Sequence, residues 1–368
     1  MVRLRPAVFS LFLALVLFAP AVAQSTDAVF PGEQWEYVRP GQLADHGWNG
    51  QALRTVMEHL RDDSNSTGVV VVDRGRVVFR FGDIEELSYV ASVRKSILAM
   101  LYGYWVENGT IDLEATLEEM GMDDIGGLLP IERQARIQDL VTARSGVYHP
   151  ASYSGDDLSQ APPRGSQQPG SYMLYSNWDF NAAGAAFELA TGRDIYDEIQ
   201  SQLANPLQFE DWDRNMQQKA GNLTVSQYPA YPIWVSTRDM ARIGYLMLNE
   251  GSWNGEQVIS QDWTRRITSV VTPLEEMNPV RRRDGYFGYG YMWWVWDGPR
   301  AVGPFEGAYT ARGAWGQWIT VFPALDMVIA HKTHNVYRRT TTWESWHRMV
   351  ELLFEAKGVE MKGPYPWG

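Results

Sequence analysis

The stretch Ser92-Val-Arg-Lys-Ser-Ile-Leu-Ala-Met-Leu-Tyr-Gly-Tyr-Trp-Val-Glu107 is almost entirely apolar, yet it carries a lysine one turn after its first residue. Its apolar character predicts a helix that is buried on most sides. Residues three apart share a helix face, so Lys95 would stand beside the Ser92 hydroxyl at the positive end of the helix dipole. A serine becomes nucleophilic when an adjacent base takes its proton. Taken alone, the pair also fits a capping serine followed by a surface lysine.

Two further segments could complete such a site. Tyr175-Ser-Asn177 follows a loop rich in Ser, Pro, Gly and Gln and precedes a predicted helix, so Tyr175 could share a proton with Lys95. Gly313-Ala-Trp-Gly-Gln317 is expected to open a strand, where a backbone N–H could point at a substrate oxygen. Each segment also has a plainer interpretation. Tyr175 could be an ordinary packed aromatic followed by a helix cap, and the segment 313–317 could be a bulge or turn.

In this order, the three segments resemble the class C β-lactamase-like serine hydrolases. That group includes penicillin-binding proteins, esterases and 6-aminohexanoate-dimer hydrolase. The resemblance runs from about Gly41 to the C-terminal helix. Other segments that carry it are Leu140-Val-Thr-Ala-Arg-Ser-Gly146, Tyr175-Ser-Asn-Trp-Asp-Phe-Asn181, Ser236-Thr-Arg-Asp-Met-Ala-Arg-Ile-Gly244 and Gly288-Tyr-Gly-Tyr-Met-Trp-Trp294.

The resemblance implies an α/β fold of the α+β type, in which helices flank an antiparallel sheet and a helical lobe stands beside it. It implies that Ser92 is acylated, that Lys95 and Tyr175 form a coupled proton-transfer pair, and that the backbone N–H groups of Ser92 and Ala314 form an oxyanion hole. Substrate contacts would come from Asn177, Gly313 and Trp315, with Asn177 touching either a substrate amide or Lys95.

The third segment departs from the family pattern. The β-lactamases and penicillin-binding proteins carry Lys-Thr-Gly or His-Thr-Gly where this chain has Ala311-Arg-Gly313. Ala311 cannot bind the carboxylate that penicillins carry, so we expect β-lactams to be poor substrates. Arg312 should point away from Ala311 on a strand, unless a bulge turns it inward. Lys332-Thr-His334 looks similar, but it follows the next strand and lacks the glycine.

Strand patterns near both ends of the chain enclose a helical middle, which predicts one antiparallel sheet completed by both ends. The α/β lobe would comprise about 24–95 and 284–368, and the helical lobe about 96–283. A hairpin is expected over 68–81, and Pro323-Ala-Leu-Asp326 is expected to join the last two strands. The other predicted elements are helices over 51–61, 92–107, 177–191, 236–249 and 342–355 and strands over 289–296, 317–322 and 327–332.

Composition narrows the possible partners. The formal net charge is −12 and no basic stripe is present, so nucleic acid is not an expected partner. The absence of cysteine excludes disulfides and thiolate metal sites. The six histidines have no metal-ligand spacing, and no cofactor is expected.

The first residues resemble an export signal. Arg3 and Arg5 precede the apolar run 8–18, and Ala21-Val-Ala23 follows it, which predicts a signal peptide over 1–23. An uncleaved anchor is the alternative. After cleavage we expect no stable membrane anchor, and a location in the periplasm or the medium.

Together these features predict an exported serine hydrolase that cleaves an ester or amide through a Ser92 acyl-enzyme. The alternatives are a β-lactamase or D-alanyl-D-alanine carboxypeptidase and, from another class, a non-catalytic cell-wall binding protein on the same fold. A binder would not need Ser92, Lys95 and Tyr175 together. The natural substrate, the preference between ester and amide, and the oligomeric state stay open at this point.

Overall fold

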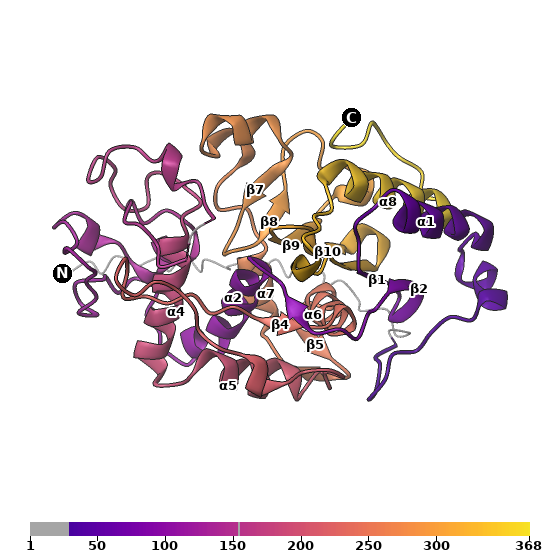
Figure 1. Cartoon of the computed structure of the whole chain (residues 1–368), viewed down its shortest axis with the longest axis horizontal. Coiled ribbons are helices and arrows are strands. Elements are labelled where there is room, and N and C mark those ends of the chain that lie inside the picture. Colours follow the sequence, from indigo (N-terminus) through magenta and orange to yellow (C-terminus); the bar gives the residue numbers. More distant parts are fainter. Residues whose placement is uncertain (1–28, 154) are drawn as a thin grey trace, which may run out of the picture.

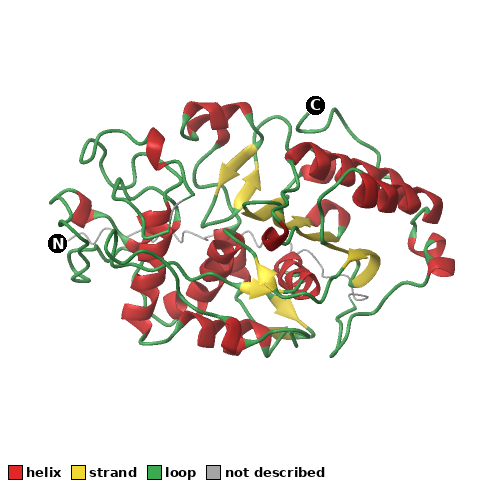
Figure 2. Cartoon of the chain, in the orientation of Figure 1, coloured by secondary structure: helices red, strands yellow, loops and turns green. Residues whose placement is uncertain are grey.

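The computed structural model describes residues 29–153 and 155–368, which form helices around a central antiparallel sheet (Figures 1 and 2). The sheet has seven strands in the order β2-β1-β11-β10-β9-β8-β7. Strands from the two ends of the chain are therefore neighbours in it, which confirms the predicted closure. The strands are β1 Gly68–Asp73, β2 Arg76–Gly82, β7 Phe287–Tyr289, β8 Trp294–Trp296, β9 Tyr309–Gly313, β10 Gln317–Phe322 and β11 Met327–Lys332.

The β1–β2 hairpin confirms the turn predicted at Asp73-Arg-Gly75. Gly75 has a positive φ of 79°, and a Cβ there would lie 1.9 Å from the carbonyl oxygen of Val29, so only glycine fits. β1 is buried along its whole length because it has a strand on each side and helices on both faces of the sheet. Its run of valines suits this position.

Helices cover both faces of the sheet (Figure 1). On one face, α8 (Trp343–Lys357) lies beside α1 (Gly50–Asp62) and packs Trp346 against Trp318 of β10, with ring centroids 5.5 Å apart. On the opposite face, α6 (Thr237–Leu248) lies across β1, β10 and β11. A Cβ on Gly244 of α6 would lie 2.4 Å from Val328 Cγ1, so this glycine allows the helix to approach the sheet closely.

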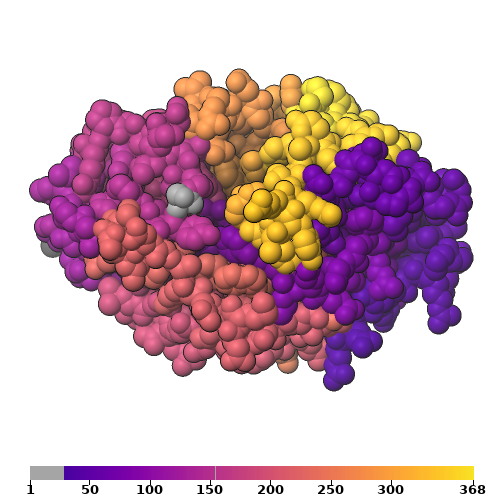
Figure 3. Space-filling view, viewed as in Figure 1, coloured from indigo at the N-terminus to yellow at the C-terminus, as the bar shows by residue number. Residues whose placement is uncertain are grey.

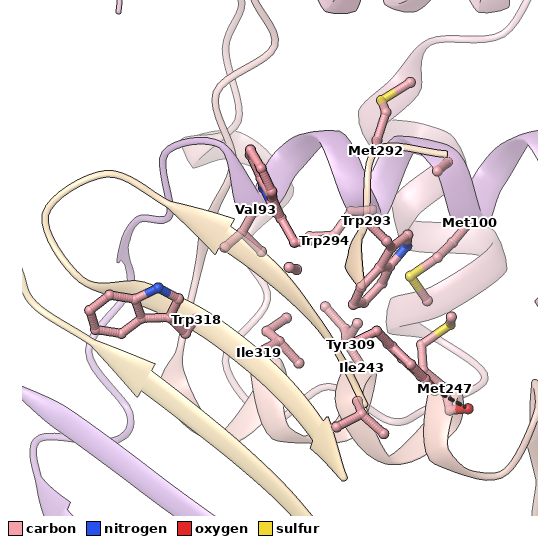
Figure 4. Close-up of a cluster of buried hydrophobic side chains, with 14 of the residues drawn as sticks. Val93, Met100, Ile243, Met247, Met292, Trp293, Trp294, Tyr309, Trp318 and Ile319 are labelled. Carbon is pink, nitrogen blue, oxygen red and sulfur yellow. Dashed lines mark hydrogen bonds between the residues drawn. The ribbon is translucent and has the colours of Figure 1, made fainter. Parts of the chain in front are cut away.

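Helix α2 (Val93–Glu107) joins the sheet to the remaining helices, and its residues 93–103 are all buried. Figure 4 shows Val93 and Met100 of α2 in one apolar cluster with Ile243 and Met247 of α6 and Ile319 of β10. The other α-helices are α3 Ile137–Val141, α4 Asn177–Thr191, α5 Ile195–Ile199 and α7 Gln261–Ile267. Two small strand pairs are β3 Ser88–Tyr89 with β4 Trp234–Val235, and β5 Ser252–Trp253 with β6 Glu256–Gln257.

The predicted helices are present, with ends that differ by at most two residues. The single strand predicted over 289–296 is wrong, because the chain reverses there to form β7 and β8. Met292 has a positive φ of 59°, and the N–H of Gly290 donates to the carbonyl of Trp293 at 2.9 Å. A Cβ on Gly290 would lie 2.6 Å from the carbonyl oxygen of Ile267, so the glycine both permits the turn and packs tightly. The aromatic run around it hid this turn.

The division into two lobes stays a prediction. One observation bears on it, since α6 belongs to the segment 96–283 assigned to the helical lobe but packs on the sheet. The predicted signal peptide, 1–23, lies outside the described residues. None of the helices described has the length and apolar character needed to cross a membrane.

Candidate active site

Ser92 occupies a sharp turn between β3 and α2, because helical geometry begins at Val93 and Ser92 is the residue before it. Ala91 adopts a left-handed conformation with φ 48°, which is unfavourable for a residue with a Cβ. The N–H of Val90 donates to the carbonyl of Ile233 at 3.0 Å and ties this turn to the chain that leads into β4. The turn therefore holds the Ser92 side chain at the entrance to the helix.

Lys95 is buried, with 1% of its surface exposed, and none of its hydrogen-bond partners among the described residues is a carboxylate. Its Nζ donates to Tyr175 Oη at 2.6 Å and to Asn177 Oδ1 at 2.6 Å. The ammonium also lies 4.1 Å from the ring centroid of Tyr175 and 4.3 Å from that of Phe180. Burial lowers the pKa of Lys95 well below its usual value, and the nearby Arg94 charge lowers it further.

Tyr175 contacts Lys95 and lines the same cavity as Ser92. Burial raises the pKa of the Tyr175 phenol, while the nearby Ser92 hydroxyl and the charges of nearby arginines oppose that rise. The ring packs 4.9 Å from Phe180 and 5.4 Å from Trp294, centroid to centroid, which fixes its direction. Tyr175 stands just before α4, at the loop–helix junction that the sequence predicts.

Asn177 makes the second of the two contacts that the sequence leaves open. Its Oδ1 accepts from Lys95, its Nδ2 donates to the carbonyl of Tyr153 at 3.3 Å, and its backbone N–H donates to Asp156 at 2.8 Å. The side chain is buried and does not line the cavity in front of Ser92. Of the two contacts that the sequence leaves open, the structure shows the one with Lys95, at the back of the site.

Arg94 is a residue that the sequence analysis missed. It is buried in α2, where its Nη2 donates to Asn181 Oδ1 at 2.8 Å and its guanidinium lies 4.2 Å from the ring centroid of Tyr231. No carboxylate pairs with it among the described residues, and its Nη1 has no hydrogen-bond partner there. A second cation inside an apolar helix is the signal that would have identified it.

The segment Gly313–Gln317 is a turn between two strands, so the expectation that it opens a strand is only half right. Gly313 ends β9, Gln317 begins β10, and Trp315 between them has φ 64°. A Cβ on Gly313 would lie 2.5 Å from the carbonyl oxygen of Val90, so the glycine lets β9 approach the turn that carries Ser92. In the described chain, the N–H groups of Ser92 and Ala314 donate to no protein acceptor.

A cavity of about 410 Å³ opens in front of Ser92. Figure 3 shows a hollow on this face, where parts of the chain from the middle and the C-terminal end meet. Of the predicted site residues, Ser92, Tyr175, Gly313, Ala314 and Trp315 line the cavity. Trp315 is 37% exposed at its rim. Lys95 and Asn177 lie behind this lining.

Arg312 also lines this cavity, whereas Ala311 is completely buried. The two side chains leave β9 on opposite faces, as the alternation of a strand requires. Arg312 pairs across the strands with Trp318, on the face covered by α8, and its guanidinium lies 4.2 Å from the ring centroid of Trp343. Arg312 therefore points away from Ala311, as the sequence predicts, and it still lines the cavity because the cavity extends around the end of β9.

Lys332 stands apart from this site, as expected for the misleading Lys-Thr-His sequence. Its Nζ donates to the carbonyl oxygens of Glu86 and Val235, each at 2.7 Å, and it does not line the cavity. Burial lowers its pKa to about 7. Across the described residues, no group of three or more His, Cys, Asp or Glu side chains could hold a metal ion.

Comparisons with known proteins agree with this arrangement. The sequence model of one protein family, described as Beta-lactamase, matches residues 53–343. An uncharacterized protein of Alkalihalophilus pseudofirmus is 24% identical over 268 residues, which are 65% of this chain and 71% of that protein.

Two solved structures illustrate the fold. A putative 6-aminohexanoate-dimer hydrolase from Bacillus anthracis superposes with a TM-score of 0.63 at 20% identity, over 83% of each chain. The hydrolase EstCE1, described as having promiscuous acyltransferase activity, superposes with a TM-score of 0.61 at 15% identity, over 85% of this chain and 99% of its own. At these identities the likeness concerns the fold.

Proposed function

Because the chain belongs to the Beta-lactamase family, we propose that it is a serine hydrolase that cleaves an ester or amide bond through an acyl-enzyme on Ser92. The observation that carries this proposal is the contact of Lys95 Nζ with Tyr175 Oη at 2.6 Å, directly behind a serine that faces a cavity. A buried lysine and a buried tyrosine in contact are suited to take up and return a proton.

In the proposed reaction, Ser92 Oγ attacks the acyl carbonyl carbon while its proton passes to the Tyr175–Lys95 pair. Burial favours the neutral amine of Lys95 and the neutral phenol of Tyr175. The pair can therefore accept one proton without first losing one. That proton then goes to the leaving alcohol or amine as the carbonyl–heteroatom bond breaks. Water hydrolyses the acyl-enzyme with the same pair as base.

The oxyanion of the tetrahedral intermediate needs donors that are already in position. The free N–H groups of Ser92 and Ala314 are the proposed donors, since both residues line the cavity. The tight approach of Gly313 to Val90 supports their pairing, because it brings the turn after β9 close to the turn that carries Ser92. Most substitutions of Ala314 would leave its backbone N–H in place, so they would not test this role.

Within this class we favour a carboxylic ester or a linear amide over a β-lactam. Ala311 is buried and offers no charge at the third motif. A β-lactamase or D-alanyl-D-alanine carboxypeptidase stays the second candidate, because Arg312 lines the cavity and could meet a carboxylate. A non-catalytic cell-wall binder is the least favoured function, since it would have no use for the Lys95–Tyr175 pair.

We also propose export, with a mature chain that starts at or near Gln24. The support is the sequence of the first residues, in which Ala21-Val-Ala23 follows an apolar run. The intact mass of protein secreted from an expressing bacterium tests this. A mass that includes residues 1–23 would favour the anchor instead.

The test of the catalytic proposal is covalent labelling with a fluorophosphonate, followed by peptide mapping. We expect one label, on Ser92, and no labelling or ester hydrolysis in Ser92→Ala. The matched control is Ser96→Ala, one turn along α2, where the hydroxyl donates to the carbonyl of Met292 at 2.6 Å. Labelling of Ser92→Ala at the wild-type rate would contradict the assignment, and absence of any label on the wild-type protein would favour the binder.

A further inference from the structure

A second cavity, of about 280 Å³, adjoins the one in front of Ser92. The two share Arg282, Trp294, Arg312 and Trp343 in their linings, so together they form one groove that leads away from Ser92. The far end of the groove is walled by Tyr286, Phe287 and His347. It lies on the α8 side of the sheet, because Arg312 leaves β9 on that face.

The second cavity is rich in positive charge. Arg281, Arg282 and Arg312 line it, and no carboxylate does. His347 adds no charge near neutral pH, because burial lowers its pKa to about 4. Asp157, which is outside the lining, accepts from Arg281 Nη2 at 2.9 Å and from Arg282 Nε at 2.8 Å, so one carboxylate pairs with two of the three cations and neutralises one unit of their charge.

Arg312 is the cation left over. In the described part of the chain its guanidinium makes no hydrogen bond and no ion pair, and it is held by two indole rings instead. Its central carbon lies 4.2 Å from the ring centroid of Trp343 and 5.3 Å from that of Trp294. Stacking of this kind fixes the plane of a guanidinium while its N–H groups stay available. Burial lowers the pKa of Arg312 to about 10, so it stays cationic at neutral pH.

A guanidinium prepared in this way fits a carboxylate, which it can bind through two parallel hydrogen bonds. The one acid that lines the first cavity, Glu344, is exposed at the start of α8 and is absent from the lining of the second cavity. The aromatic walls between Ser92 and Arg312 would contact an apolar or planar spacer.

We propose that this second cavity binds a carboxylate of the substrate through Arg312, so that the preferred substrates are esters or amides with a carboxylate several bonds from the scissile carbonyl. This inference rests on the proposed hydrolase activity at Ser92 and adds the substrate class to it. The carboxylate site is distinct from the position of Ala311, which is on the opposite face of β9.

The kinetic test uses two substrate series, each paired with its neutral methyl ester. One series has the acid on the acyl chain (4-nitrophenyl monoesters of linear dicarboxylic acids from glutaric to sebacic), and the other has it on the leaving group (acetoxybenzoates and acetoxyphenylacetates). In one series we expect the acid to be preferred in kcat/KM by about tenfold or more, mainly through KM. In Arg312→Gln the ratio of acid to neutral substrate should fall towards one, and Arg312→Lys should restore part of it.

The matched control is Arg265→Gln, which removes an exposed arginine of α7 that pairs with Glu250. This variant should leave the ratio of acid to neutral substrate unchanged. Because each ratio compares two substrates on one protein, partial misfolding of a variant cancels. The inference is overturned if neither series favours the acid, or if the preference persists in Arg312→Gln.

A binding test separates failure of this inference from failure of the proposed function. Hexanoate is titrated into Ser92→Ala protein while tryptophan fluorescence is followed, since Trp294 and Trp343 flank Arg312. We expect saturable binding that weakens with salt, is absent with hexanamide, and is lost in Ser92→Ala/Arg312→Gln. If wild-type protein hydrolyses no ester but binds hexanoate in this way, the hydrolase proposal fails and the carboxylate site stands. If the wild-type protein hydrolyses esters without an acid preference and does not bind hexanoate, the carboxylate site fails and the hydrolase proposal stands.

Discussion

Two lysines of this protein are buried to the same degree, yet only one is placed for chemistry. Lys95 and Lys332 are each 1% exposed, and burial lowers the pKa of both. Lys332 donates to two backbone carbonyls, which cannot exchange a proton with it. Lys95 donates to a phenol that lines the same cavity as the serine. The comparison teaches that a lowered pKa does not distinguish the two lysines, whereas a titratable partner beside a cavity does.

Removal of each amine should break this comparison most clearly. Lys95→Met should lower kcat/KM for ester hydrolysis by about 10²- to 10⁴-fold, the usual contribution of a general acid–base group. Lys332→Met should instead lower the free energy of unfolding by about 1–3 kcal/mol per carbonyl left without a donor, and leave most of the turnover per folded molecule. Steady-state kinetics and urea unfolding measure the two effects. If Lys332→Met loses the activity and Lys95→Met loses only stability, the role proposed for Lys95 is wrong.

A smaller effect is expected from the phenols. Tyr175→Phe removes the hydroxyl between Lys95 and Ser92 and should lower kcat/KM by about 10²-fold. Tyr289→Phe is the matched control, because Tyr289 packs with its ring centroid 6.1 Å from that of Tyr175 and its buried hydroxyl has no hydrogen-bond partner among the described residues. Fluorophosphonate labelling rates should follow the same order. Equal losses in the two variants would mean that packing, and not proton transfer, explains Tyr175.

Arg94 provides a test through pH. Its charge lowers the pKa of both Lys95 and Tyr175, so Arg94→Gln should raise both. A proton acceptor with a raised pKa stays protonated to a higher pH, and the profile of kcat/KM should therefore shift to higher pH. Arg94→Lys keeps the charge and should keep the profile. If the pH profile of kcat/KM is unchanged in Arg94→Gln, Arg94 has a structural role and does not set the pKa values of the site.

Lys332 gives the smallest effect, on stability alone. Its pKa is about 7 in the folded protein and near the ordinary lysine value of 10.5 when unfolded. Above about pH 7 the unfolded chain therefore binds a proton that the folded chain does not, so this group makes the protein more stable as pH rises towards 10.5 and has a constant effect below about 7. Urea unfolding across this range should show the wild-type protein gaining stability relative to Lys332→Met. A constant difference between the two proteins would contradict the lowered pKa.

The sequence was sufficient for those features that depend on local pattern and order. The apolar helix after Ser92, the hairpin at Gly75 and the closure of the sheet by both ends all follow from periodicity and turn residues, and they are confirmed. The β-lactamase/transpeptidase-like fold and the family are confirmed as well. The roles given to Ser92, Lys95 and Tyr175 stay predictions, although the structure brings the three residues together.

The features that the sequence did not predict depend on contacts between distant segments. The reversal between β7 and β8 packs Gly290 closely against the carbonyl of Ile267, and the aromatic run around it gave no sign of a turn. Strand alternation predicted the face of β9 from which Arg312 points, opposite to that of Ala311. Alternation does not say how far a cavity extends around the end of the strand. That extent depends on Trp343, which the start of α8 brings to the groove.

The pairing of β1 with β11 has a consequence for how the chain folds. Gly68 lies opposite Lys332 and Asp73 opposite Met327, so these two neighbouring interior strands of the sheet are separated by most of the sequence. Contacts between such distant segments form slowly, because a long loop must close before they contribute. A chain that ends before residue 327 lacks the partner of β1 and has a sheet divided into two pieces. Synthesis must therefore pass residue 332 before the sheet can close, and until then the valines of β1 are available to chaperones or to aggregation.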